Sequence, residues 1–276
     1  MTMVSTASVL FCILTLFISL ILPVLALVLF AARNRRQGIV SAWLLGAAGF
    51  FVTQILIRLP ILTVLQSQSW FLNFAQSHLF AYSFCLAFTA GLFELAGRFG
   101  VAKIIQKNLS FNRSLAAGLG HGGIEAMVLI GMTYVNNLVY IFMINSGAFD
   151  TMLAQSAAMG VDVAQLELIR TQLMSTSPML FALAGFERLL AMTGHAAMSL
   201  VVCYGVAHKK VLSCILICLG IHTLMDLTAG ISLVLPQNTA YPIIYVILTA
   251  MAAISIALIL DIRRRWNKEV SYDSEK

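Results

Sequence analysis

The ionisable residues of this chain occur in pairs at helical spacing inside long apolar stretches. They are Glu94 with Arg98, His121 with Glu125, Arg188 with His195 (Glu187 beside them), and His222 with Asp226. A charged group at the bilayer centre costs roughly 2.5–3.5 kcal/mol on insertion scales, so such residues are retained mainly for function or for pairing. Three histidines and two carboxylates at similar depth predict a hydrolytic or metal site, with proton or ion transport as the main alternative.

These residue types suffice for amide hydrolysis without a covalent intermediate. A carboxylate in an apolar pocket can serve as a general base near neutral pH, and a neighbouring histidine can hold the attacking water. A second histidine, fixed by Asp226, could donate to the oxyanion. The chain contains no Gly-x-Ser-x-Gly, no HExxH and no phosphate-binding glycine loop. We therefore expect no cofactor, although a zinc site built from His121, Glu125, His195 and His222 is possible.

The elements that must position these side chains are membrane helices. A hydrophobic content of 60% with only 10% charged residues excludes an ordinary soluble domain. Each apolar run reaches the ~20 residues that span the bilayer, and helices satisfy their own backbone groups there. The sequence predicts an all-α polytopic protein with one integral membrane domain over residues 1–276. The predicted spans are 4–32, 39–65, 76–97, 114–145, 179–204, 209–233 and 240–262.

The distribution of basic residues predicts the topology and the location. Arginines and lysines follow the first, third, fifth and seventh spans, whereas the other loops hold one basic residue, Arg170. This alternation predicts an N-terminus outside and a C-terminus in the cytoplasm. We expect a multi-pass protein of a bacterial plasma membrane whose partners are the lipid bilayer and a membrane protein or peptide, with no nucleic acid.

Depth along the spans predicts which residues meet. Counted from the cytoplasmic ends, Glu125, His195 and His222 lie at about one level, so we expect them to share a cavity. Arg188 and Asp226 lie about a turn deeper, which predicts an ion pair that would orient His222 through Asp226. Glu94 and Arg98, and likewise Glu187 and Arg188, are expected to act as supporting or structural ion pairs.

Other segments carry weaker signals. The extracellular loop 146–178 contains apolar residues at helical spacing and is expected to form an amphipathic helix in part. The cytoplasmic tail 262–276 is charged and is expected to be unstructured. Arg58, near the outer end of the second span, can snorkel to the interface. Gly118 and Gly122 have the spacing that lets another backbone approach closely, for helix packing or for a bound peptide.

At the motifs His-Gly-Gly-Ile-Glu (121–125), Glu-Arg followed by His195, and His222-x-x-x-Asp226, the chain resembles the YhfC-type intramembrane proteases. These resemble the PrsW proteases and, more distantly, the type II CAAX prenyl endopeptidases and the bacteriocin-immunity-type membrane proteases. The similarity covers about residues 75–235. It implies a glutamate-dependent membrane protease, with a metalloprotease as the other interpretation. By motif position, Glu125 and His195 would activate water, and His222 with Asp226 would stabilise the oxyanion.

The chain departs from the distant relatives at two motifs, one of which is a Phe-x-x-x-His pattern that is absent because Ala191 precedes His195 by four. The other is the glutamate motif. The distant relatives carry paired glutamates followed by a basic residue four positions later, whereas here Glu125 follows Ile124 and position 129 is Leu. The leading hypothesis is an intramembrane endopeptidase that cuts a membrane-associated protein or peptide with glutamate- and histidine-activated water. The alternatives are a zinc-dependent protease, a proton- or ion-coupled transporter, and a scaffold that binds peptides without cutting them. A transporter would show internal repeats, and only a Phe-Glu pair recurs, at 93–94 and 186–187.

Overall fold

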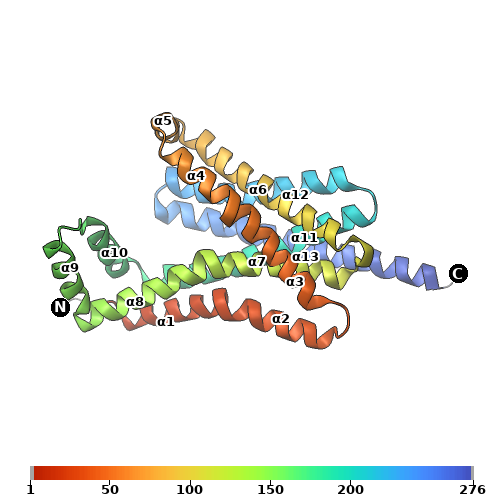
Figure 1. Cartoon of the computed structure of the whole chain (residues 1–276), viewed down its shortest axis with the longest axis horizontal. Helices are drawn as coiled ribbons and strands as arrows, with labels where there is room; N and C mark the ends of the chain where they lie inside the picture. The colour runs from red at the N-terminus through yellow and green to blue at the C-terminus, as the bar shows by residue number, and fades with distance from the viewer. Residues whose placement is uncertain (1–2, 275–276) are drawn as a thin grey trace. The chain divides into compact units, whose positions relative to one another are not determined.

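The structure is a computed structural model that describes residues 3–274, with side-chain surroundings through residue 268 (Figure 1). Within this range the elements are helical, and seven helical stretches are long and apolar enough to cross a membrane. This confirms the all-α polytopic architecture, because each predicted span overlaps one of them. They are Thr6–Arg33, Ile39–Gln66, Leu79–Ile104, Phe111–Ser146, Pro178–Ala207, Val211–Val234 and Gln237–Lys268.

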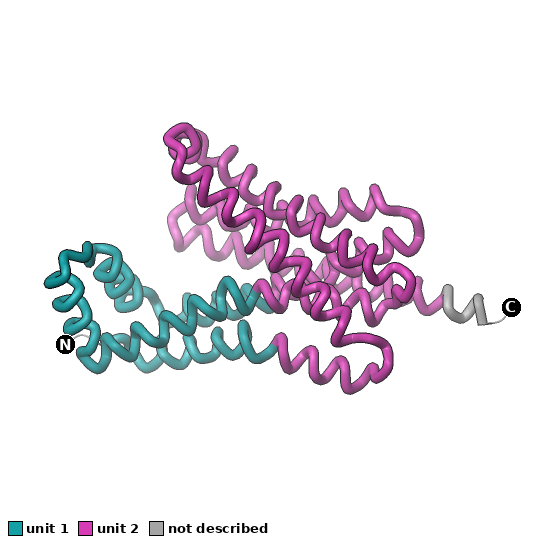
Figure 2. The backbone as a smooth tube through the Cα atoms, viewed as in Figure 1, with its two compact units in different colours: residues 1–22, 126–189 teal, residues 23–125, 190–276 magenta. Residues whose placement is uncertain are grey.

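The chain divides into two compact units, coloured separately in Figure 2. The first unit contains residues 1–22 and 126–189. Its helices are α1 (Thr6–Leu16), η1 (Phe17–Ile21), η4 (Ala126–Gly131), α8 (Met132–Ser146), α9 (Ala148–Ala158), α10 (Ala164–Ser175) and the start of α11 (Pro178–Ala207). The segments η1 and η4 are π-helical.

Polar contacts tie the first unit together around the carbonyl oxygen of Phe181. The hydroxyl of Thr15 donates to it at 2.6 Å, and the hydroxyl of Tyr134 at 3.3 Å. Satisfying a carbonyl in this way matters because an unpaired buried polar group is costly. The predicted helix of the loop 146–178 is α10, which follows α9, and Arg170 of α10 pairs with Asp150 of α9 at 2.8 Å.

The second unit contains residues 23–125 and 190–276. It holds the rest of α11 and the following helices: α2 (Leu22–Arg33), α3 (Ile39–Phe50), η2 (Phe51–Arg58, π-helical), α4 (Leu59–Gln66), α5 (Ser69–Ser77), α6 (Leu79–Ile104), η3 (Gln106–Asn108), α7 (Phe111–Glu125), α12 (Val211–Val234) and α13 (Gln237–Ser274). Since α13 continues through Ser274, the expectation of an unstructured tail after residue 261 is wrong for the described residues.

Glycines bring the backbones of the second unit close together. A Cβ atom added at Gly122 would lie 2.8 Å from Cβ of His195, and one at Gly118 would lie 2.7 Å from Cα of Ala196. The predicted small-residue stripe on α7 therefore packs directly against α11. This close approach sets the depth at which His195 meets the residues of α7, because a larger side chain would separate the two helices.

An apolar core supports the polar centre of this unit. Leu95 and Ala102 of α6 pack with Met198 and Val202 of α11, and Met225 of α12 joins them. The helix α11 is enclosed over this stretch, since Met198 and Leu200 are fully buried. A helix packed on all sides holds its side chains in fixed positions, which a reacting centre requires.

Candidate active site

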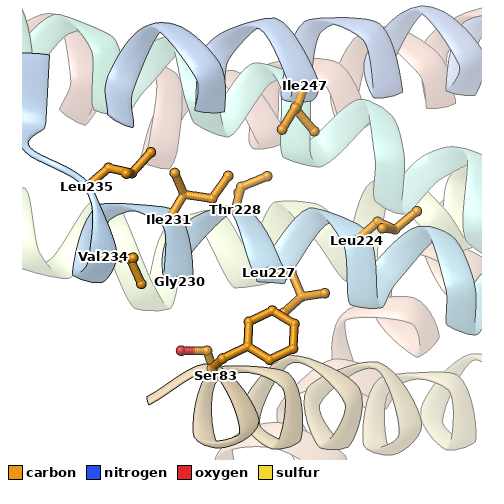
Figure 3. Close-up of a pocket in the computed structure, with 10 residues that line it drawn as sticks. Ser83, Leu224, Leu227, Thr228, Gly230, Ile231, Val234, Leu235 and Ile247 are labelled. Atoms are coloured by element: carbon orange, nitrogen blue, oxygen red, sulfur yellow. The ribbon is translucent and has the colours of Figure 1, made fainter. Parts of the chain in front are cut away.

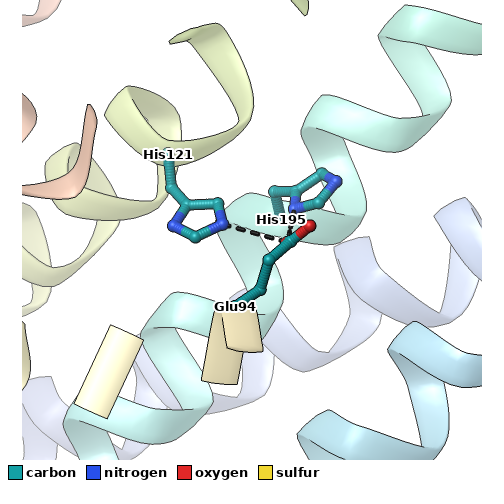
Figure 4. A group of neighbouring side chains, drawn as sticks. All are labelled: Glu94, His121 and His195. Carbon is teal, nitrogen blue, oxygen red and sulfur yellow. Dashed lines mark hydrogen bonds and ion pairs between the residues drawn. The ribbon is translucent and has the colours of Figure 1, made fainter. Parts of the chain in front are cut away.

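The carboxylate of Glu94, on α6, lies at the centre of the buried polar cluster. Its Oε2 atom is 2.7 Å from Nε2 of His222, 3.0 Å from Nε2 of His121 and 3.0 Å from Nη2 of Arg98. Figure 4 shows this carboxylate pointing to His121 and His195 from a different helix. Glu94 was expected only to support the site as an ion pair with Arg98. The ion pair is present, but the carboxylate also faces the histidines directly.

Three imidazoles from three helices converge on that one oxygen. His121 comes from α7, His195 from α11 and His222 from α12, and the three residues are 1%, 3% and 2% exposed. The Nδ1 atom of His195 lies 3.6 Å from Oε2 of Glu94. The ring of Phe50 packs edge-on against His121, with centroids 5.4 Å apart. The structure therefore brings together three of the residues that the sequence singled out.

His195 connects Arg98 to Glu125. Its Nδ1 atom is 2.6 Å from Nη2 of Arg98, and its Nε2 atom is 2.8 Å from Oε2 of Glu125. A guanidinium has only donors, so Nδ1 must be the accepting nitrogen and Nε2 the one that carries the proton. The protonated Nε2 of His195 thus faces the carboxylate of Glu125 on the outer side of the ring, while the inner nitrogen faces Glu94.

His222 has a similar outer partner. Its Nδ1 atom lies 3.4 Å from Oδ2 of Asp226, one turn further along α12. This separation is within ion-pair range but longer than the 2.7–3.2 Å of a good hydrogen bond. Asp226 is also the most open of these carboxylates, with 38% of its side chain exposed, against 12% for Glu125.

Two of the predicted supporting residues belong to the first unit. They are Glu187 and Arg188, whose side chains form an ion pair with each other. Because Asp226 belongs to the second unit, the expected pair between Arg188 and Asp226 stays a prediction.

Gln54 was not among the predicted site residues, but it donates from Nε2 to Oε1 of Glu94 at 2.7 Å. Gln54 lies in the π-helical segment η2 and is only 5% exposed. A signal was present, since an amide inside an apolar span needs a partner. A signal for Glu94 was also present, because Arg98 follows it by four residues. This is the spacing between glutamate and basic residue that the distant relatives show and that Glu125 lacks.

The donor set of this centre fits a zinc ion. The ligand atoms of Glu94, His121 and His195 lie within 4.8 Å of one another, and His222 faces the same carboxylate oxygen. Imidazoles and a carboxylate are the usual zinc ligands outside thiolate sites. Two of the imidazoles also have a carboxylate beside the outer nitrogen, an arrangement typical of metal-binding histidines. In contrast to the predicted zinc site, the carboxylate that lies among the imidazoles is Glu94, and Glu125 contacts His195 from outside.

An apolar cavity of about 420 Å³ lies between α6, α12 and α13 (Figure 3). Leu224 and Ile231 of α12 and Ile247 of α13 are among its lining residues. Leu224 is two positions from His222, and such positions point about 200° apart on a helix. The cavity therefore faces another side of α12 and is separate from the polar centre.

The fold and the centre define a class of protein: a multi-pass membrane protein with histidines and carboxylates buried among its membrane-spanning helices. The sequence profile described as "YhfC intramembrane metalloprotease" matches residues 18–253, and the chain belongs to this family. The chain is also similar to "Uncharacterized membrane protein YhfC" of Bacillus subtilis (strain 168), with 30% identity over 229 residues, which is 82% of this chain and 86% of the relative. No solved structure matches.

These findings confirm the resemblance to YhfC-type proteins and the multi-pass membrane location. The description of the family also supports membrane protease as the general class of this protein. The relationships to the PrsW and CAAX proteases stay predictions, as do the roles of individual residues.

Proposed function

We propose that the protein is an intramembrane endopeptidase that hydrolyses a peptide bond of a membrane-associated protein or peptide at the Glu94 centre. The observation that supports this most strongly is the convergence of three imidazoles, from three helices, on one buried carboxylate oxygen. Leucines at these positions would stabilise the fold at least as well, because buried ion pairs are rarely net stabilising. Such a costly cluster is expected where chemistry needs it.

His121, His195 and His222 would hold a zinc ion, consistent with the family's description as metalloproteases. A bound zinc ion would polarise the scissile carbonyl and make a bound water acidic enough to ionise near neutral pH. Glu125 and Asp226 would fix the orientation of His195 and His222 through their outer nitrogens.

Glu94 would take the proton from the attacking water at Oε2. That atom faces all three imidazoles within 3.6 Å, so a water held at this centre lies within reach of it. The sequence pointed to Glu125 for this role. The geometry favours Glu94, because Glu125 lies on the far side of His195 from the centre.

The test compares Glu94→Gln with the wild type in cells whose membrane proteins are analysed for new N-termini by mass spectrometry. We expect termini that depend on the wild-type protein and disappear in Glu94→Gln, while the purified variant still binds zinc. Asp261→Asn is the matched control, because its exposed pair with Arg265 lies away from the centre. If cleavage continued undiminished in Glu94→Gln, Glu94 would not be the base.

A further inference from the structure

Gln54 makes two hydrogen bonds with its amide nitrogen, both to α6. Nε2 donates to Oε1 of Glu94 at 2.7 Å and to the carbonyl oxygen of Ala90 at 3.2 Å. Ala90 precedes Glu94 by four residues and lies one turn away on the same helix. The amide therefore ties the Glu94 carboxylate to the backbone that carries it.

Arg58 fixes which way the Gln54 amide points. Its Nη1 atom lies 3.3 Å from Oε1 of Gln54, and its Nη2 atom donates to the carbonyl oxygen of Leu86 at 2.7 Å. A guanidinium cannot accept a hydrogen bond, so the side facing Arg58 must be the amide oxygen. The contacts then run in one direction, from Arg58 through Gln54 to Glu94.

The π-helical segment η2 places both side chains against α6. Gln54 and Arg58 are four residues apart in it, and both contact residues of α6. Short π-helical segments are found frequently at functional sites. The guanidinium of Arg58 contacts Gln54 and the backbone of α6, as a structural role requires.

This arrangement distinguishes the two oxygens of Glu94. Oε1 accepts from the Gln54 amide, so it is the oxygen held toward η2. Oε2 is left facing the histidines and Arg98. A carboxylate without such a restraint could rotate and exchange its oxygens, and reacting groups must be held close to the productive geometry.

We infer that Gln54, held by Arg58, positions Glu94 so that Oε2 is the oxygen that faces the histidines. This inference rests on the proposed function for the identity of the reacting group. Gln54 is a positioning residue, since it acts through Glu94. Partners of this kind typically contribute about 10- to 100-fold to activity at metal sites.

The experiment uses the full-length protein in detergent and compares Gln54→Met, Arg58→Met, Arg58→Lys and Thr53→Val. Methionine is an unbranched side chain close in length to glutamine. It makes no strong hydrogen bonds, and a membrane helix tolerates its apolar character. Thr53 is the matched control in the same segment, because its hydroxyl donates at 2.8 Å to the carbonyl oxygen of Gly49, four residues earlier in the chain, and not to Glu94. Infrared spectra provide the carboxylate bands of Glu94, identified as those present in the wild type and absent from Glu94→Gln.

We expect the Glu94 bands to shift in Gln54→Met, to shift less in Arg58→Met, and to stay unchanged in Arg58→Lys and Thr53→Val. The abundance of the new protein N-termini that require Glu94 should decrease about 10- to 100-fold in Gln54→Met. Unchanged bands and unchanged cleavage in Gln54→Met would overturn the inference while leaving the proposed function intact.

Two further outcomes separate the inference from the proposed function. If the wild type produced no Glu94-dependent termini but the bands still shifted, positioning would be supported and the proposed function would fail. If Gln54→Met did not fold, Arg58→Met would decide: a shift that Arg58→Lys restores supports the inference, and no shift overturns it.

Discussion

The Nε2 atom of His195 lies 2.8 Å from Oε2 of Glu125, so the inner nitrogen of the same ring, Nδ1, is the one that faces Glu94. This contact separates the two glutamates by position. Glu94 lies inside the ring of imidazoles, and Glu125 contacts one imidazole from outside. The contributions of Glu94 and Glu125 can therefore be tested separately.

Glu125→Gln should weaken zinc binding and cleavage by about 10- to 100-fold without abolishing either, because an amide can still contact His195 Nε2 but no longer carries charge. Competition with a chromophoric chelator measures the affinity, and protein termini report cleavage. Complete loss of cleavage with unchanged zinc affinity would instead identify Glu125 as the base.

The purified wild type should contain stoichiometric zinc by elemental analysis, and chelation should stop cleavage until zinc is added back. His121→Ala should lower the zinc affinity by about 100-fold or more, because it removes a ligand from the centre. His208→Ala is the control, since that side chain stacks on Tyr204 away from the centre. A wild type that cuts without any metal would favour the glutamate mechanism alone.

Arg98→Met should bind zinc about tenfold more tightly than the wild type, a difference of about 1.4 kcal/mol. In the structure Nη2 of Arg98 donates a hydrogen bond to Nδ1 of His195 at 2.6 Å, so that nitrogen is not free to bind a metal. The positive charge of the guanidinium also repels a nearby cation. Calorimetric titration with zinc measures the change. Weaker binding in Arg98→Met would show that Arg98 supports the centre more than it competes with a metal.

Gly122→Ala should destabilise the protein by about 1–3 kcal/mol, because the added Cβ would lie 2.8 Å from Cβ of His195 and force α7 and α11 apart. Gly100→Ala is the control: a Cβ there meets nothing within 4 Å, and alanine favours the helix. Thermal unfolding in detergent compares the two. Equal midpoints would mean that the helices adjust without cost.

The N-terminus should lie outside the cell and the C-terminus in the cytoplasm, because basic residues follow alternate spans. Single cysteines placed in the connection 146–178 and in the loop at Lys209 should react differently with an impermeant reagent in intact cells, the first labelled and the second protected. The reverse pattern would invert the topology.

The sequence alone indicated the architecture and most of the residues of the centre. Apolar length determines the seven spans, since only a helix satisfies its backbone in lipid. Ionisable residues in such spans are expensive, and this cost singled out His121, His195 and His222 by residue type and position. The glycine stripe on α7 also indicated close packing, which the contact of Gly122 with His195 shows.

Only the tertiary structure decided which carboxylate lies among the imidazoles. Helical periodicity places Glu94 and Arg98 on one face of α6 and His121 and Glu125 on one face of α7, but it does not say which faces meet. That depends on how the helices rotate and pack, which joins residues as distant as Gln54, Glu94 and His222. The sequence determined that a polar centre exists, and helix packing determined that Glu94 stands at its middle.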